Sequence, residues 1–285
     1  MKIRLFLIVV LVCVTLGAAV GGSQLASASG DITLERSPWR IGNIQRDAQV
    51  SWVSAAFEPR TRQPMAAYYD AALTYFIRAT RLGPNLGNCG DGLAWDCDQV
   101  KTGTGIGQYS DSANYGDLAG RYYRIGYVYY EDSNVDVPEL NYFACYSDRD
   151  NPTGYYCNGS RLLNFPILSS RTIGSAAALA FDEDGKAHVV VINDTPVGSF
   201  LLYIHPKVGI NGTCMTYGGS GDWDCEVIVQ GLGSAVDPSI VIAADGKPRI
   251  AYYDAANGRL QLAYPSTEEQ NCGPSTTWRC VMIDG

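Results

Sequence analysis

Eight of the nine cysteines fall into four close pairs, and this spacing constrains the fold more than any other feature of the sequence. The two members of each pair are 8, 12, 11 and 8 positions apart: Cys89 and Cys97, Cys145 and Cys157, Cys214 and Cys225, Cys272 and Cys280. Local pairing, in which each disulfide closes one loop, is the simplest prediction, and it implies an oxidising compartment. Zinc is the alternative, but the chain has no CxxC motif, and His188 and His205 lie away from the pairs.

The cysteine pairs mark an internal repeat of about sixty residues. An aromatic residue stands two positions before the second cysteine of every pair: Trp95, Tyr155, Trp223 and Trp278. Upstream of each pair, an apolar segment ends in a polar residue at position 70, 131, 193 or 254, so the repeat advances by 61, 62 and 61 residues. Two independent signals in one register indicate a repeat protein.

The last unit shows what each repeat contains. Apolar segments at 238–244, 249–253, 260–264 and 278–283 predict four strands, and Asp245-Gly246 and Asn257-Gly258 predict tight hairpins between them. Repeated units of four short antiparallel strands are typical of β-propeller blades, so we expect an all-β propeller over residues 49–285, with about four blades and one local disulfide in each. Residues 109–120 predict a long polar loop in the second unit. Within 31–48, the segment 38–44 resembles a fourth strand, either from a preceding blade or as an extra strand that closes the ring.

The chain resembles exported bacterial β-propeller repeat proteins with BNR-like or WD40-like blades. The resemblance is carried by Gly246-Lys247-Pro248-Arg249-Ile250-Ala251-Tyr252-Tyr253-Asp254, by Leu260-Gln261-Leu262-Ala263-Tyr264 and by the W-x-C elements. It implies a fold and little chemistry, because these motifs are structural. The sialidase Asp-box, S-x-D-x-G-x-x-W, is absent from the sequence.

The first 30 residues predict a cleaved signal peptide. Lys2 and Arg4 precede an apolar segment over 5–20, and Ala26-Ser27-Ala28 is a small-residue cleavage site. Cleavage moves the formal net charge from -8 to -10, because two cations and no acid are removed. This negative charge disfavours nucleic acid as a partner, because phosphate backbones bind clustered Lys and Arg. No later segment is long and apolar enough to predict a membrane span. We expect a secreted or cell-surface protein.

The polar residues that end the apolar segments form the candidate ligand site: Asp70, Glu131, Asn193 and Asp254. Equivalent loops of propeller blades lie on one face, so these oxygens would converge there and hold Ca²⁺ or sugar hydroxyls. The neighbouring Tyr69, Tyr130 and Tyr253 would supply stacking surfaces. The alternative is structural, because Asp and Asn at strand ends commonly bond the backbone of their own turn.

Catalytic motifs are absent from the sequence. His188 and His205 lie in strand patterns without a neighbouring nucleophile motif, and no HExxH, phosphate loop or dinucleotide fingerprint occurs. We therefore expect a non-catalytic propeller that binds carbohydrate or an extracellular protein through one face of the ring. The alternatives are a glycoside hydrolase or lyase that uses the acidic ring, and a purely structural surface module. An oligomer is expected if four blades do not close.

Overall fold

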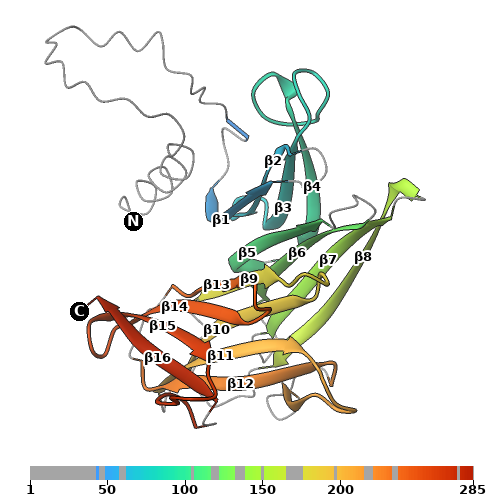
Figure 1. Ribbon diagram of the computed structural model, residues 1–285. Coiled ribbons are helices and arrows are strands. Elements are labelled where there is room, and N and C mark those ends of the chain that lie inside the picture. The colour runs from blue at the N-terminus through green and yellow to red at the C-terminus, as the bar shows by residue number, and fades with distance from the viewer. Residues whose placement is uncertain are drawn as a thin grey trace, which may run out of the picture. The chain divides into compact units, whose positions relative to one another are not determined.

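The computed structural model folds the repeats into four antiparallel sheets of four strands each (Figure 1). It describes residues 43–44, 49–57, 62–103, 106–116, 122–131, 139–148, 151–164, 176–195, 198–214, 221–232, 237–274 and 277–284. The predicted signal peptide, residues 1–30, and most of the N-terminal segment 31–48 lie outside the described residues.

Each sheet is a meander in which consecutive strands pair. Sheet A contains β1 (Val50–Phe57), β2 (Pro64–Asp70), β3 (Tyr75–Arg81) and β4 (Trp95–Thr102). Sheet B contains β5 (Ile106–Gly116), β6 (Tyr122–Glu131), β7 (Glu139–Asp148) and β8 (Asn151–Asn164). Sheet C contains β9 (Ala176–Phe181), β10 (Ala187–Thr195), β11 (Gly198–Pro206) and β12 (Trp223–Gln230). Sheet D contains β13 (Ser239–Ile242), β14 (Pro248–Asp254), β15 (Arg259–Pro265) and β16 (Trp278–Asp284).

The predicted all-β fold, with units of four antiparallel strands joined by hairpins, is confirmed. The four segments that end at positions 70, 131, 193 and 254 all form the second strand of a sheet. Gly185 and Gly246 have φ of 71° and 74°, and each donates its N–H to the carbonyl three residues earlier. Glycine adopts this left-handed conformation without a steric cost, which is why an Asp-Gly pair forms the hairpin.

Apolar cores lie between consecutive sheets, because each sheet packs one face against the next. One cluster joins sheets A and B around Phe76, a second joins B and C around Val128, and a third joins C and D around Trp278. The first strands β1, β5, β9 and β13 contact one another in that order. In the described part of the chain, β13 has no comparable contact with β1. The four sheets are therefore shown, but they do not close into a ring.

Three of the four predicted disulfides are confirmed: Cys89–Cys97, Cys214–Cys225 and Cys272–Cys280. For the fourth pair, the backbone register places Cys145 opposite Cys157. The side chain of Cys157 lies outside the described residues.

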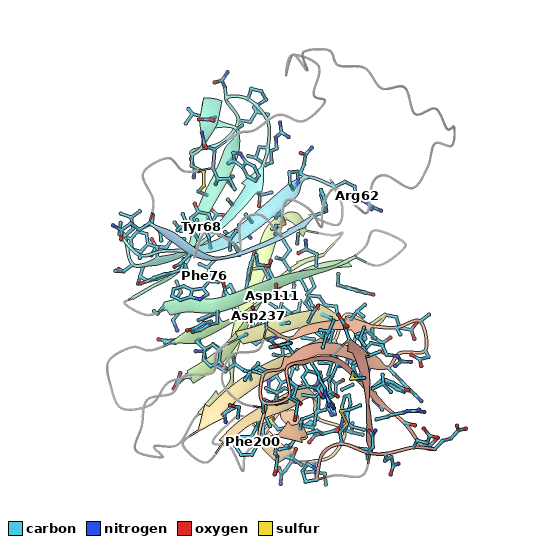
Figure 2. All side chains as sticks on the ribbon, turned by 90° about the vertical axis from the view of Figure 1, so that its left-hand side faces the viewer. Arg62, Tyr68, Phe76, Asp111, Phe200 and Asp237 are labelled. Atoms are coloured by element: carbon cyan, nitrogen blue, oxygen red, sulfur yellow. A yellow bond between two sulfur atoms is a disulfide. The ribbon has the colours of Figure 1, made fainter. Side chains whose placement is uncertain are left out.

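The prediction of a polar loop over 109–120 is wrong for its described part, because β5 occupies Ile106–Gly116. Polar side chains of this strand are half-buried and bond to neighbouring sheets. Asp111 (Figure 2) accepts the Ser54 hydroxyl of β1 at 2.7 Å and the Leu179 N–H of β9 at 2.9 Å. It also accepts the Ser112 N–H at 2.8 Å. One carboxylate thus links the first strands of three sheets.

Candidate functional site

Two of the predicted acidic ligands bond to the turns that follow them. Asp70 is fully buried and accepts the Ala72 and Leu73 N–H groups at 2.9 and 3.3 Å. Asp254 is also buried and accepts the Asn257 N–H and the Asn257 and Gln261 side-chain amides at 2.8–3.2 Å. These bonds favour the structural alternative, since both carboxylates stabilise their own β2–β3 or β14–β15 turn.

The other two predicted ligands have different surroundings. Glu131 forms an ion pair with Lys101 of sheet A and accepts the Asn141 side-chain amide at 3.2 Å. Asn193 is half-buried and lies opposite Phe200. Within the described residues, no three His, Cys, Asp or Glu side chains come close enough together to hold a metal ion.

The three candidate tyrosines are not equivalent. Tyr69 and Tyr130 are buried, and the Tyr130 hydroxyl donates to the Ile192 carbonyl at 3.3 Å. Tyr253 is 46% exposed. Of the three, Tyr253 alone presents a ring that a sugar or a protein side chain could cover.

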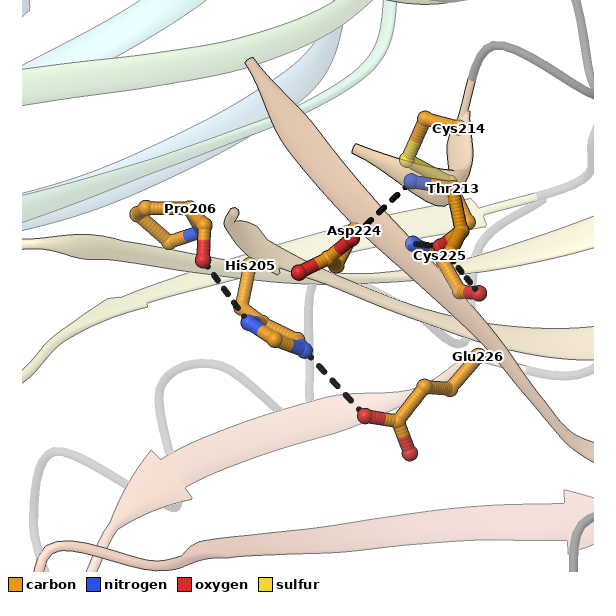
Figure 3. The surroundings of a disulfide bond; sticks show 7 residues. All are labelled: His205, Pro206, Thr213, Cys214, Asp224, Cys225 and Glu226. Atoms are coloured by element: carbon orange, nitrogen blue, oxygen red, sulfur yellow. Dashed lines mark hydrogen bonds and ion pairs between the residues drawn. A yellow bond between two sulfur atoms is a disulfide. The ribbon is translucent and has the colours of Figure 1, made fainter. Parts of the chain in front are cut away.

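The loop between β11 and β12 is a feature that sequence reasoning missed. Val208 and Ile210 are 89% and 91% exposed, although the loop that carries them is firmly held. Figure 3 shows the supporting contacts around the Cys214–Cys225 disulfide. Asp224 accepts the Val208 and Thr213 N–H groups, each at 2.9 Å. The combination places two aliphatic side chains in solvent on a fixed backbone.

Related contacts hold the loops of sheets A and D. The residue before the first cysteine bonds the backbone of the second: Asn88 accepts the Cys97 N–H at 2.7 Å, and Asn271 accepts the Cys280 N–H at 2.7 Å. Thr213 bonds Cys225 in the same way at 2.8 Å. We call the described parts of the three connections between third and fourth strands the braced loops: residues 82–94, 207–214 with 221–222, and 266–274 with 277. In sheet A the braced loop includes the short 3-10 helix Asp91–Leu93 and carries Leu86, which is also exposed.

A sequence signal for the braced loops exists. An Asn or Thr precedes the first cysteine of each, and aliphatic residues interrupt otherwise polar, glycine-rich stretches such as Lys207-Val208-Gly209-Ile210-Asn211-Gly212. An exposed aliphatic side chain does not stabilise the folded monomer by burial, so these apolar residues are candidates for contact with a partner.

Both histidines of the chain lie in one polar ladder on the face of sheet C that packs against sheet D. His188 contacts the Tyr203 hydroxyl at 2.5 Å through Nδ1 and Asp182 at 3.3 Å through Nε2. The Tyr203 ring stacks on His205 with ring centroids 5.0 Å apart. The ladder therefore extends across three strands of one sheet.

Glu226 joins the ladder to sheet D. It contacts His205 Nε2 at 3.1 Å (Figure 3). It also accepts the Trp278 indole N–H at 2.9 Å. Burial lowers the pKa of His188. Burial would also lower the pKa of His205, but its bonds to Glu226 and the Pro206 carbonyl, together with the charges of Glu226 and Asp224, leave the pKa raised. The hydrogen bond from His205 lowers the pKa of Glu226.

Comparison of the chain with models of known protein families and with curated proteins finds no match. Among the described residues, no helix has the length and apolar character needed to cross a membrane. The described disulfides are consistent with an extracellular protein. The functional argument therefore depends on the geometry alone.

Proposed function

We propose that this chain is a secreted, non-catalytic module of propeller type that binds a protein through the apolar tips of its braced loops. The observation that carries the proposal is the near-complete exposure of Val208 and Ile210 on a loop fixed by a disulfide and by Asp224. Single exposed aliphatic residues are ordinary on protein surfaces, but rigid presentation of two together is not.

Rigidity matters because binding must offset the entropy lost when a loop becomes ordered. A loop that already holds its bound conformation avoids this cost, which is about 0.5–1.5 kcal/mol for each immobilised side chain. The Asp224 carboxylate and the Cys214–Cys225 disulfide supply this preorganisation. The apolar tips then contribute the burial of Val208 and Ile210, about 1.5–3 kcal/mol for each side chain.

A protein partner is favoured over a carbohydrate by the chemistry of the tips. Sugars stack on aromatic rings and bond to polar groups, whereas Val208 and Ile210 offer only aliphatic surface. The carboxylates of Asp70 and Asp254 are engaged in turns, and Tyr253 is the one exposed ring among the sugar-binding candidates. Carbohydrate binding is therefore the second candidate, and it rests on Tyr253.

The propeller assignment rests on the repeated packing between sheets. Trp223 lies edge-on to Tyr142 of the preceding sheet at 5.4 Å, and Trp278 lies edge-on to Tyr203 of the preceding sheet at 5.3 Å. Equivalent residues therefore make equivalent contacts at successive interfaces between sheets, which we call seams. This is the relationship between neighbouring propeller blades.

The test is to select peptides that bind the mature protein from a displayed library and to measure their affinity for loop variants. We expect the double variant V208D/I210D to bind at least about tenfold more weakly, because it places charges in an apolar contact. L73D, an exposed aliphatic position at the β2–β3 turn, is the matched control and should bind normally.

A glycan array and phosphatidylcholine vesicles are screened in parallel. Peptide binding that survives in V208D/I210D would contradict the proposal. Glycan binding that survives in the loop variant and is lost in Y253A would support the carbohydrate alternative. Vesicle binding that is lost in the loop variant would identify a lipid surface as the target instead.

A further inference from the structure

Equivalent positions on the four sheets differ in burial at the last sheet. The residue before the polar end of the second strand is buried in the first three sheets, as Tyr69, Tyr130 and Ile192, but in sheet D it is Tyr253, 46% exposed. These residues are equivalent because each lies one position before residue 70, 131, 193 or 254. In sheets A to C, the next sheet covers this position.

The residue of the third strand that lies opposite this position follows the same pattern. Phe76, Leu140 and Leu201 are fully buried, whereas Leu260 is 39% exposed. Each of these residues pairs with the residue that precedes the polar end of the second strand, and this shared register makes them equivalent.

A bulged residue in the fourth strand gives a third comparison. Ile228 of β12 lies in the register shift of that strand and is fully buried against sheet D. Ile283 of β16 lies in the corresponding shift, also five residues after its tryptophan, and is 53% exposed. Tyr253, Leu260 and Ile283 together define what we call the open face of sheet D.

Sheet A, the first of the four consecutive sheets, is contacted at its outer side by residues 43 and 44. In the C–D seam, the backbone of β12 packs against the braced loop of sheet D: a Cβ on Gly273 would lie 3.0 Å from the Val227 carbonyl and 2.6 Å from that of Ile228. At sheet A, a Cβ on Gly90 would lie 2.9 Å from the Asn43 carbonyl and 3.2 Å from that of Ile44.

Asn43 and Ile44 thus stand where the fourth strand of a preceding sheet would stand. The Asp91 N–H donates to the Asn43 carbonyl at 2.8 Å, and Ile44 packs on the cluster that contains Tyr68. Ile44 is five residues after Trp39, as Ile228 is after Trp223. Among the described residues, Asn43 and Ile44 therefore occupy the part of sheet A around Gly90 and Tyr68 that a preceding sheet would contact.

We propose that the open face of sheet D binds the open face of a second copy of this chain, forming a two-fold symmetric dimer. The face has the residue pattern of the buried A–B, B–C and C–D seams, so it is built for burial. Its head-to-tail complement on sheet A is covered by Asn43 and Ile44. Self-association through one face then closes at two copies.

The charges on this face permit self-association. Arg249 bonds Asp245 at 2.8 Å and lies over the Tyr264 ring, and Arg279 forms an ion pair with Glu269. Each arginine is thus compensated within its own chain. Two copies therefore bring these neutral pairs together, and Asp284, which lies opposite Leu260, is a further charge at this part of the face.

The test is sedimentation velocity of the mature chain over a range of concentrations, with L260E and I283E as interface variants. We expect a dimer whose dissociation constant increases at least about tenfold in each variant, since an unpaired carboxylate would be buried. L73E is the matched control and should dimerise normally. Circular dichroism and melting temperature establish that every variant is folded.

A second measurement separates the remaining outcomes. I283C is treated with a maleimide reagent under native conditions, at high and low protein concentration. Protection that appears only at dimer concentrations supports the proposal. A concentration-independent monomer overturns it, and a protected I283C in that monomer would mean that the chain's own sheet A covers the face. A dimer unaffected by both variants, or growth beyond two copies, also overturns it.

Discussion

Replacing Asp111 with alanine should destabilise the protein more than removing any exposed carboxylate. Asp111 accepts three hydrogen bonds, from the Ser54 hydroxyl and from the Leu179 and Ser112 N–H groups. The Ser112 N–H also donates to the Ser54 hydroxyl oxygen at 3.0 Å, so it keeps an acceptor in the variant. The Leu179 N–H loses the Asp111 acceptor, and the contact from β5 to β9 is lost with it.

The expected change in the free energy of unfolding is the contribution of the lost hydrogen bonds less the desolvation cost that the variant avoids. Hydrogen bonds to a charged group contribute about 1.5–3 kcal/mol each, and the bonds from Ser54 and Leu179 are both lost. The Ser54 hydroxyl can donate to Ser112 Oγ, 2.9 Å away, which replaces part of its contribution. Burial raises the pKa of Asp111, because desolvation of the carboxylate outweighs the hydrogen bonds from Leu179, Ser54 and Ser112. Removal of this cost offsets part of the loss, so we expect a net decrease of about 2–4 kcal/mol in the free energy of unfolding.

The assay is thermal and urea denaturation of D111A, D111N and the control D184A. A decrease of this size corresponds to roughly 5–12 °C in melting temperature for a chain of this length. Asn should restore the volume and not the pairing, because either orientation of the amide directs its NH₂ group toward a backbone N–H. Asp184 is exposed and pairs with Lys186, so D184A should lose less than about 1 kcal/mol. If D111A melts within about 2 °C of D184A, the link between three sheets is wrong.

Three further predictions test the ladder, the braced loop and the turns. NMR titration should find the pKa of His205 above its usual value, and a lower pKa in E226Q. The ion pair contributes its full stabilisation below the unfolded pKa and loses it as pH rises through the folded pKa. E226Q should therefore flatten this pH dependence of stability. The double variant C214A/C225A should lose up to about 3 kcal/mol of stability on the chain-entropy model and should bind the selected peptides more weakly, by calorimetry. D70A should lower the melting temperature by an amount equivalent to about 1–3 kcal/mol without changing glycan binding; unchanged melting with lost binding would restore the ligand role of Asp70.

The repeat was predictable from sequence because its signals are local and recur four times. A strand that ends at Asp70 or Asp254, an Asp-Gly hairpin and a nearby cysteine pair each depend on residues within a few positions of one another. The disulfides were predictable for the same reason. Each of these features also recurs in register, so that one unit supports the interpretation of the next.

The strand β5 and the link from the polar ladder to sheet D could not be predicted in this way, because the bonded partners lie 52 to 68 positions apart. Asp111 bonds Ser54 and Leu179, 57 and 68 positions distant. Its polar sequence predicts a loop when these partners are unknown. His205 and Trp278 likewise meet at Glu226 only after sheets C and D have packed. The distinction is whether a polar group is bonded within its own unit or by a neighbouring sheet.

The candidate site shows that repeated positions give an ambiguous signal for a ligand site. A residue that recurs in every unit serves what every unit needs, and Asp70 and Asp254 serve their turns. Function is better sought where units differ: Val208 and Ile210 occur in one braced loop, and Tyr253, Leu260 and Ile283 are exposed in one sheet alone. The first difference lies in a loop, which is free to vary without disturbing the seams. The second lies at positions that sheets A to C bury against the next sheet and that sheet D exposes. We propose that a second copy of this chain covers them.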